Sequence, residues 1–114
     1  MNQDEIKRTA QQSWFELPLE LRAYFLSLLS HNLTISIRLV YSESVSVDET
    51  LKKVYSLNEL QHKISSTLMH LTQEGKLSQP DEHFLDTLYD VAQQGGCEWE
   101  LALAFNYTLP AFEK

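Results

Sequence analysis

Apolar residues recur every three to four positions along most of the chain, and this helical period predicts the architecture. We expect about five helices, over residues 4–14, 18–42, 47–74, 80–94 and 97–108. Their ends are set by common helix-start and helix-stop residues: Pro18 and Pro80, the capping box Ser46–Glu49, and the glycines Gly75, Gly95 and Gly96. The only alternating run, residues 44–47, is too short to predict a strand.

The two longest expected helices have apolar faces of different width. The face of residues 18–42 spans roughly 200°, and its main stripe runs through Leu21, Phe25, Leu28, Ile35 and Leu39. The stripe of residues 47–74 is narrower and contains Val54, Leu57, Leu60, Ile64, Leu68 and Leu71. A wide face suits a central helix, and the short connection between the two helices implies antiparallel packing. We therefore predict an all-α fold, a compact bundle of about five helices with a long central antiparallel helical hairpin.

Length and composition are those of one folded domain. The chain has 114 residues, of which 43% are hydrophobic, and both values suit a single helical domain with its own core. We predict that residues 1–114 form this domain and that residues 1–15 form a loosely packed N-terminal helix.

Sequence features relevant to location point to the cytoplasm. The first twelve residues are polar and contain acids, which is unlike a signal peptide. No apolar run reaches the roughly 18 residues of a membrane span. The single cysteine excludes an internal disulfide and suits a reducing compartment. We expect a cytoplasmic protein with no membrane contact.

The net charge of −7 is concentrated in the C-terminal third. Residues 77–113 contain seven acids and no Lys or Arg, whereas residues 1–76 are close to neutral. Such a surface repels nucleic acid and favours a basic protein partner. We predict an acidic partner face made of Glu82, Asp86, Asp90, Glu98 and Glu100. Plain solubility is the alternative explanation of the charge.

Polar residues interrupt the apolar pattern of the expected hairpin. The first helix of the hairpin contains Asn32 within its apolar face and His31, Arg38 and Tyr41 beside it, and the second contains Asn58, Glu59 and His62. We predict that Asn32, Arg38, Asn58 and Glu59 form hydrogen bonds between the two helices, because a buried unpaired amide costs about 1–3 kcal/mol. Three interpretations stay open: a structural network that sets the register, a binding or catalytic site, or plain exposure to solvent.

Other chemistry has weak support in the sequence. Glu59 and His62 have the Glu-x-x-His spacing of di-iron bundles, but only one such unit exists, so we expect no metal and no cofactor. No nucleophile elbow or phosphate-binding glycine loop is present, and we assign no catalytic residue. Cys97 lies at an expected helix start, where a thiol can be activated, but Glu98 and Glu100 oppose this. We interpret it as a small buried or capping residue.

Two patterns resemble a group of small bacterial all-helical proteins. They are His31-x-Leu-Thr-Ile-x-x-Arg38-x-x-Tyr41 and Leu57-Asn58-Glu59-x-Gln-His62, and together with a similar C-terminal stretch they cover about half of the chain. The resemblance implies a bacterial origin and a helical domain. No activity is known for this group, so no catalytic role is carried over.

The sequence favours a non-enzymatic function. We predict a small acidic protein-binding module, such as an inhibitor of the immunity or antitoxin type, that acts on a basic partner. The alternative is an enzyme or small-ligand-binding bundle that uses the His/Arg/Asn/Glu/His cluster between the two hairpin helices. Self-association as a homodimer stays open.

Overall fold

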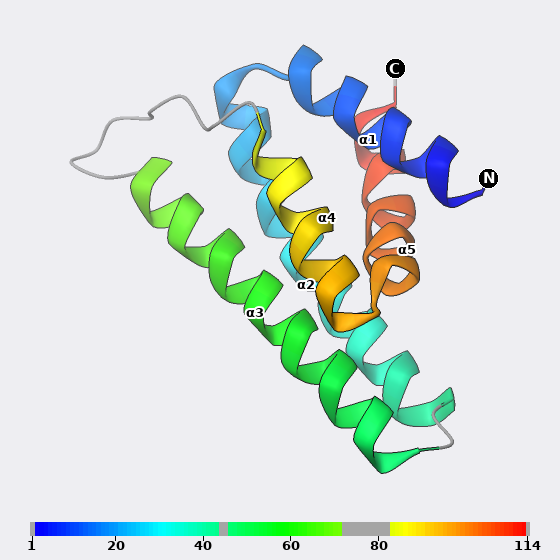
Figure 1. Cartoon of the computed structure of the whole chain (residues 1–114). Helices are drawn as coiled ribbons and strands as arrows, with labels where there is room; N and C mark the ends of the chain where they lie inside the picture. The colour runs from blue at the N-terminus through cyan, green and yellow to red at the C-terminus, as the bar shows by residue number, and fades with distance from the viewer. Residues whose placement is uncertain (1, 44–45, 72–82, 114) are drawn as a thin grey trace.

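The computed structural model describes residues 2–43, 46–71 and 83–113. These residues form five α-helices and a terminal 3-10 helix (Figure 1). The helices are α1 (Gln3–Glu16), α2 (Leu19–Glu43), α3 (Val47–Leu71), α4 (Phe84–Gly95) and α5 (Glu98–Thr108), followed by η2 (Leu109–Phe112). The prediction of an all-α fold with five helices is confirmed. The proposed stop at Gly75 and the proposed start at Pro80 lie outside the described residues.

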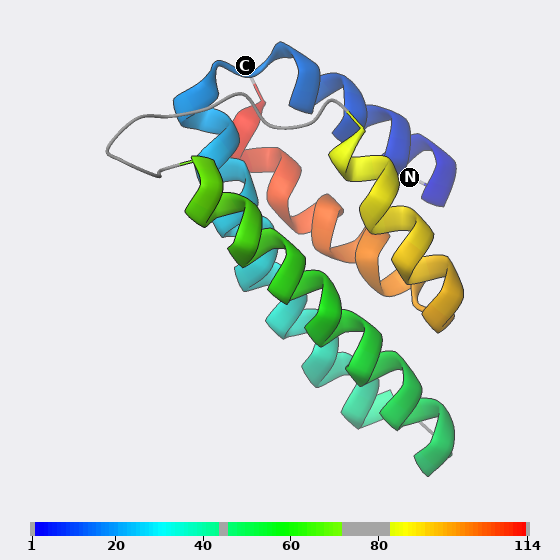
Figure 2. The ribbon, with the colours of Figure 1, turned by 60° about the vertical axis from the view of Figure 1, so that its left-hand side comes forward.

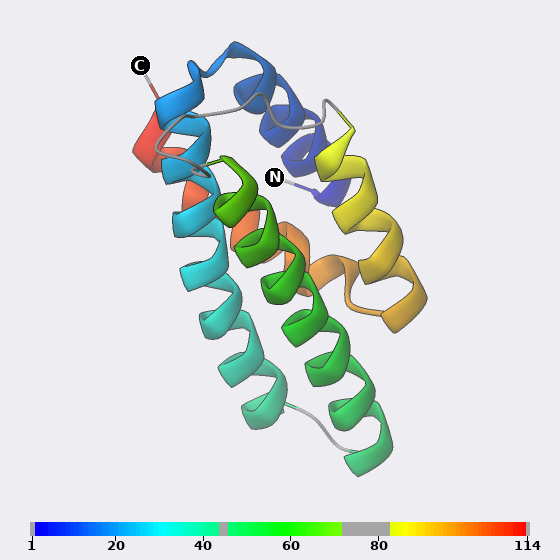
Figure 3. The ribbon, with the colours of Figure 1, turned by 90° about the vertical axis from the view of Figure 1, so that its left-hand side faces the viewer.

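An antiparallel hairpin of α2 and α3 is the longest part of the molecule (Figure 2). The views show α4 and α5 beside this hairpin and α1 across one end of it, whereas the last turn of α2 and the first turn of α3 extend beyond α5 (Figure 3). α2 packs against both α3 and α5, as its wide apolar face predicts. None of the described helices is long and apolar enough to cross a membrane.

The buried face of α2 is rotated from the predicted one. Its buried apolar residues are Phe25, Leu26, Leu29, Leu33 and Val40. Leu21, placed in the main stripe by the sequence, is 43% exposed. The reason is that α2 contacts two helices at once, so the middle of its wide arc is covered best. The stripe predicted for α3 is buried or half-buried along its described length.

Aromatic rings join α1 to the rest of the core. Trp14 is fully buried, and its ring centroid lies 5.7 Å from that of Phe25 and 6.3 Å from that of Phe84. Ile6 and Ala10 are buried on the same face of α1. The prediction of loose packing for this helix is therefore wrong, because an aromatic residue of α1 packs between rings of α2 and α4.

A buried arginine holds the turn between α1 and α2. Arg22 Nε donates to the carbonyl of Leu17 at 3.0 Å, and Nη2 donates to the carbonyl of Phe15 at 3.1 Å. Its guanidinium carbon lies 5.4 Å from the centre of the Trp14 ring. Cationic donors at a helix C-terminus satisfy its last carbonyls and its negative dipole end, so Arg22 stabilises the end of α1.

The turn between α4 and α5 depends on two glycines. Gly96 has φ 69°, in the left-handed region that favours glycine, and ends α4 as the sequence predicts. A Cβ at Gly95 would collide with the side chain of Ser56 on α3. These glycines let α4 approach α3 closely and let the chain reverse into α5.

Candidate functional site

A surface pocket of about 330 Å³ lies where the end of α2, the start of α3 and the first turn of α5 meet. We call it the hairpin-tip pocket. It combines three carboxylates and one ammonium with apolar side chains, and it is lined by Ser36, Leu39, Val40, Glu43, Glu49, Lys53, Trp99, Glu100 and Leu103.

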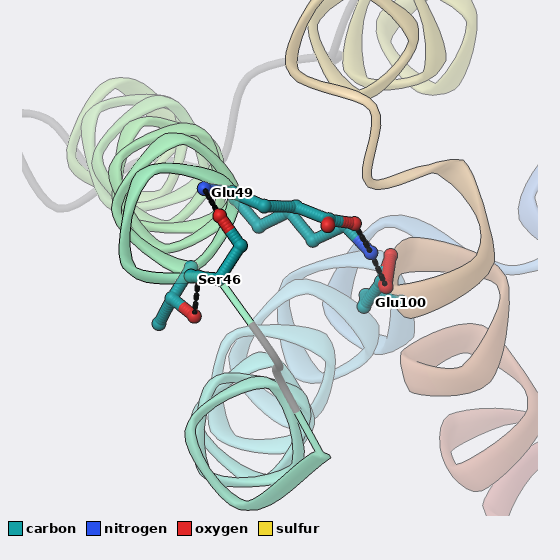
Figure 4. Close-up of polar contacts among 5 residues, drawn as sticks. Ser46, Glu49 and Glu100 are labelled. Atoms are coloured by element: carbon teal, nitrogen blue, oxygen red, sulfur yellow. Dashed lines mark hydrogen bonds and ion pairs between the residues drawn. The ribbon is translucent and has the colours of Figure 1, made fainter.

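The predicted cap at Ser46 fixes the start of α3, which forms one wall of the pocket. Ser46 Oγ accepts a hydrogen bond from the backbone N–H of Glu49 at 3.3 Å, which confirms that half of the capping box (Figure 4). The Glu49 carboxylate lies 3.4 Å from Lys53 Nζ, one helical turn further along α3. The start of α3 thus presents an acid and a base on the side that faces α5.

Lys53 connects α3 to α5. Its Nζ donates to Glu100 Oε1 at 3.0 Å, so the ammonium lies between the carboxylates of Glu49 and Glu100 (Figure 4). The hydrogen bond to Glu100 is the main reason that the pKa of Lys53 is raised above its usual value, and both carboxylates add to the effect. Lys53 is therefore held as a cation.

Glu100 is the most enclosed acid of the pocket. Its side chain is 12% exposed, and its second oxygen, Oε2, has no hydrogen-bond partner among the described residues. The backbone carbonyl of Glu100 accepts a hydrogen bond from the buried Ser36 Oγ at 2.9 Å. This bond fixes the first turn of α5 against α2. Glu100 is therefore held in the pocket wall by contacts to both α2 and α3.

The remaining walls are apolar. Val40 is buried, Leu39 and Leu103 are half-buried, and Trp99, at the edge of the pocket, is 47% exposed. Three carboxylates and one ammonium give the pocket a formal charge of −2. The combination of apolar walls, an aromatic edge and excess negative charge suits a cationic ligand with an aliphatic part.

The polar cluster predicted between the hairpin helices does not form. Asn32 is buried, but it donates to Thr108 Oγ1 of α5 at 2.9 Å and not to α3. The other six members of the set, His31, Arg38, Tyr41, Asn58, Glu59 and His62, are exposed. Among the described residues, none of the hydrogen bonds joins two members of the set. The predicted helix-to-helix bonds of Arg38, Asn58 and Glu59 are therefore wrong, because these side chains point to solvent.

A glutamine makes the polar contact within the hairpin instead. Gln61 Nε2 donates to the carbonyl of Ser30 at 3.0 Å and to Thr34 Oγ1 at 2.9 Å. Gln61 lies next to the buried stripe of α3. This position beside the stripe is the feature of the sequence that could have indicated the contact. Glu59 and His62 are exposed and lie between the buried α3 positions Leu57, Leu60 and Ile64. No group of three or more His, Cys, Asp or Glu side chains in the described ranges is placed to hold a metal ion.

The predicted acidic face is divided by the fold. Glu82 lies outside the described residues, and Glu100 is turned into the pocket, where it pairs with Lys53. Asp86 accepts a hydrogen bond from Gln11 of α1 at 2.6 Å. Asp90 is exposed and Glu98 is half-buried. Among the described members of the predicted face, Asp90 and Glu98 remain as surface charges. Asp86 and Glu100 instead contact other side chains of the molecule.

Cys97 is fully buried directly before α5. Burial is the main cause that raises the pKa of its thiol to about 12, and the charges of Glu100 and Glu98 add to it. A thiol with such a pKa is almost entirely protonated near neutral pH and is a poor nucleophile. The position agrees with the interpretation of Cys97 as a small buried residue.

Comparisons with family models, with curated proteins and with solved structures find no significant match to this chain. The resemblance carried by residues 31–41 and 57–62 stays a prediction. The geometry of the chain itself is therefore the basis for assigning a function.

Proposed function

We propose that this protein is a small acidic protein-binding module that docks a basic partner without catalysing a reaction. An inhibitor of the immunity or antitoxin type is the form that we favour, since such proteins act by covering a surface of another protein. The observation that carries the proposal is the hairpin-tip pocket, which is open to solvent and has three carboxylates against one ammonium.

The distribution of charge supports the same function. The C-terminal third contains seven acids and no Lys or Arg between residues 77 and 113. Glu98 and Glu100 bring part of this charge to the first turn of α5, beside the pocket. Charges of one sign on one region of a surface accelerate association with a partner of opposite charge.

An enzyme or small-ligand-binding bundle is the second candidate. It would use the set His31, Arg38, Asn58, Glu59 and His62 that the sequence singles out. The hairpin-tip pocket contains none of these residues, and the set is exposed on the outer side of the hairpin. A catalytic role needs these groups to converge on a reacting atom, so the geometry favours the binding module.

The test is electrostatic and needs an identified partner. We would capture partners from the cells of origin, purify the basic candidates, and measure association rates at several salt concentrations. The double variant Asp90→Lys/Glu98→Lys should slow association at low salt and flatten the salt dependence. Glu59→Lys on α3 is the matched control and should leave both nearly unchanged. Equal rates for the two variants would contradict the proposal.

A further inference from the structure

The hairpin-tip pocket has the size of a receptor for one long side chain. Its volume of about 330 Å³ lies at the lower end of the roughly 300–1,000 Å³ that is typical of ligand sites. Helices α2, α3 and α5 all contribute to its wall, so its shape does not depend on one loop.

The chain already places one cation in this pocket. Lys53 Nζ lies 3.0 Å from Glu100 Oε1 and 3.4 Å from Glu49 Oε1. This ammonium balances one carboxylate charge and leaves a formal charge of −2 among the lining residues. Glu43 is exposed at the rim, and the side chain of Glu49 is 57% exposed. These accessible carboxylates can accept hydrogen bonds from additional N–H donors.

The walls select the kind of donor. Leu39 and Leu103 offer apolar surface to an aliphatic stem, and the half-exposed indole of Trp99 offers a flat aromatic face. A guanidinium stacks on aromatic rings and donates through five N–H groups in a planar fork. An ammonium has only three donors and is more strongly hydrated, so it gains less from this site.

We propose that the hairpin-tip pocket binds an arginine side chain presented by the basic partner. The guanidinium lies against Trp99 and donates to the carboxylates of Glu43 and Glu49, and its stem contacts Leu39 and Leu103. This inference rests on the proposed function and adds to it the residue that the partner contributes. It can fail while the protein still binds a basic partner through its other acids.

Trp99 supplies the signal for a direct test. The chain has two tryptophans, and Trp14 is fully buried, so only Trp99 should respond to a ligand in the pocket. We would titrate the full chain with a capped Gly-Arg-Gly tripeptide and follow tryptophan fluorescence. Two control peptides replace the arginine. Citrulline keeps the shape of the arginine side chain but has no charge, and lysine keeps the charge but has no planar group of N–H donors. The variant Trp99→Phe should abolish the signal.

Matched charge variants locate the binding. Each of Glu43→Gln and Glu49→Gln should weaken arginine binding about tenfold, the effect of losing one charge-assisted hydrogen bond. Glu59→Gln removes an exposed carboxylate from the same helix as Glu49 and should leave the affinity unchanged. Lys53→Met removes the competing ammonium and should tighten binding. Circular dichroism of each variant verifies that the fold is intact.

The outcomes separate the two proposals. Saturable binding of the arginine peptide that citrulline does not reproduce supports the assignment. Equal responses to arginine and citrulline, equal affinity for the lysine peptide, or equal effects of Glu49→Gln and Glu59→Gln would overturn it. The peptide titrations can fail while Asp90→Lys/Glu98→Lys still slows association with a whole basic partner. In that case the pocket is not the arginine site, and the proposed function stands.

Discussion

The two polar sides of α2 have opposite roles. On the side facing α5, Asn32 and Ser36 are buried, and each has a hydrogen-bond partner on α5 at 2.9 Å. On the outer side, His31, Arg38 and Tyr41 are exposed. A polar residue in an apolar segment can thus either form a hydrogen bond to a neighbouring helix or be exposed to solvent. Burial and the partner atom decide which of the two it is.

The largest loss of stability is expected on the side of α2 that faces α5. Asn32→Ala leaves Thr108 Oγ1 without its donor in the core and should lower the free energy of unfolding by about 1–3 kcal/mol. Thr108→Val should cost a similar amount, because it leaves the Asn32 amide unpaired. Urea denaturation measures both. The double variant Asn32→Leu/Thr108→Val removes both polar groups and should recover part of the loss, whereas strictly additive losses would contradict a direct bond.

A smaller effect is expected at the hydrogen bonds within the hairpin. Gln61→Ala removes donors to the Ser30 carbonyl and to Thr34 Oγ1 and should cost about 1 kcal/mol. Gln61 is half-buried, so water can replace part of what is lost. The same denaturation experiment measures it. A loss larger than that of Asn32→Ala would reverse the ranking of the two sides.

The buried thiol before α5 predicts a loss of stability in alkali. The pKa of Cys97 is raised to about 12 from the ordinary 9.0, so above about pH 9 the unfolded chain loses a proton that the folded chain keeps. The contribution of the protonated thiol to stability is fully present below the pKa of Cys97 in the unfolded chain. It is lost as the pH rises toward the pKa of Cys97 in the folded chain. Cys97→Ala should therefore reduce the drop in unfolding free energy between about pH 8 and pH 10 by about 1 kcal/mol.

Two measurements check this pH dependence. Unfolding free energies of both chains at the two pH values give the difference. Tyr89 and Lys53, whose pKa values are also raised, are unchanged in the variant and so cancel from the comparison. Identical pH dependence in Cys97→Ala would mean that the thiol is not desolvated in the folded chain.

The smallest effect is expected on the outer side. Asn58 is exposed and makes none of the described hydrogen bonds, so Asn58→Ala should change the free energy of unfolding by less than about 0.5 kcal/mol. Thermal melts of Asn58→Ala and Asn32→Ala, run side by side, measure the contrast. A loss above about 1 kcal/mol for Asn58→Ala would restore the hydrogen-bonded cluster that the sequence predicts.

The helices could be predicted from the sequence, because their period and their end residues are local signals. The Ser46 cap and the Gly96 stop lie where the pattern indicates. The partner of Asn32 could not be predicted in the same way. Periodicity gives the direction in which a side chain points, but α2 has neighbours on two sides, and only tertiary packing decides that Asn32 meets α5.

The pocket could not be predicted for a related reason. Lys53 and Glu100 are 47 residues apart, and no local pattern connects them. The sequence contains a local signal for one side of the site, because Glu49 and Lys53 lie one turn apart on α3. The charge count identified Glu100 as an acid but not that it turns inward. Contacts between distant helices depend on how the whole bundle packs.

The pocket and the outer hairpin side can be compared in one experiment, nuclear magnetic resonance of the nitrogen-15-labelled protein during titration with the arginine tripeptide. We predict saturable shifts of the Trp99 indole N–H and of the backbone amides of Lys53 and Glu100, with the amides of His31, Asn58 and His62 unmoved. Chemical-shift changes concentrated at His31, Asn58 and His62, with no change at Trp99, Lys53 and Glu100, would contradict the assignment. They would place the binding site on the outer side of the hairpin.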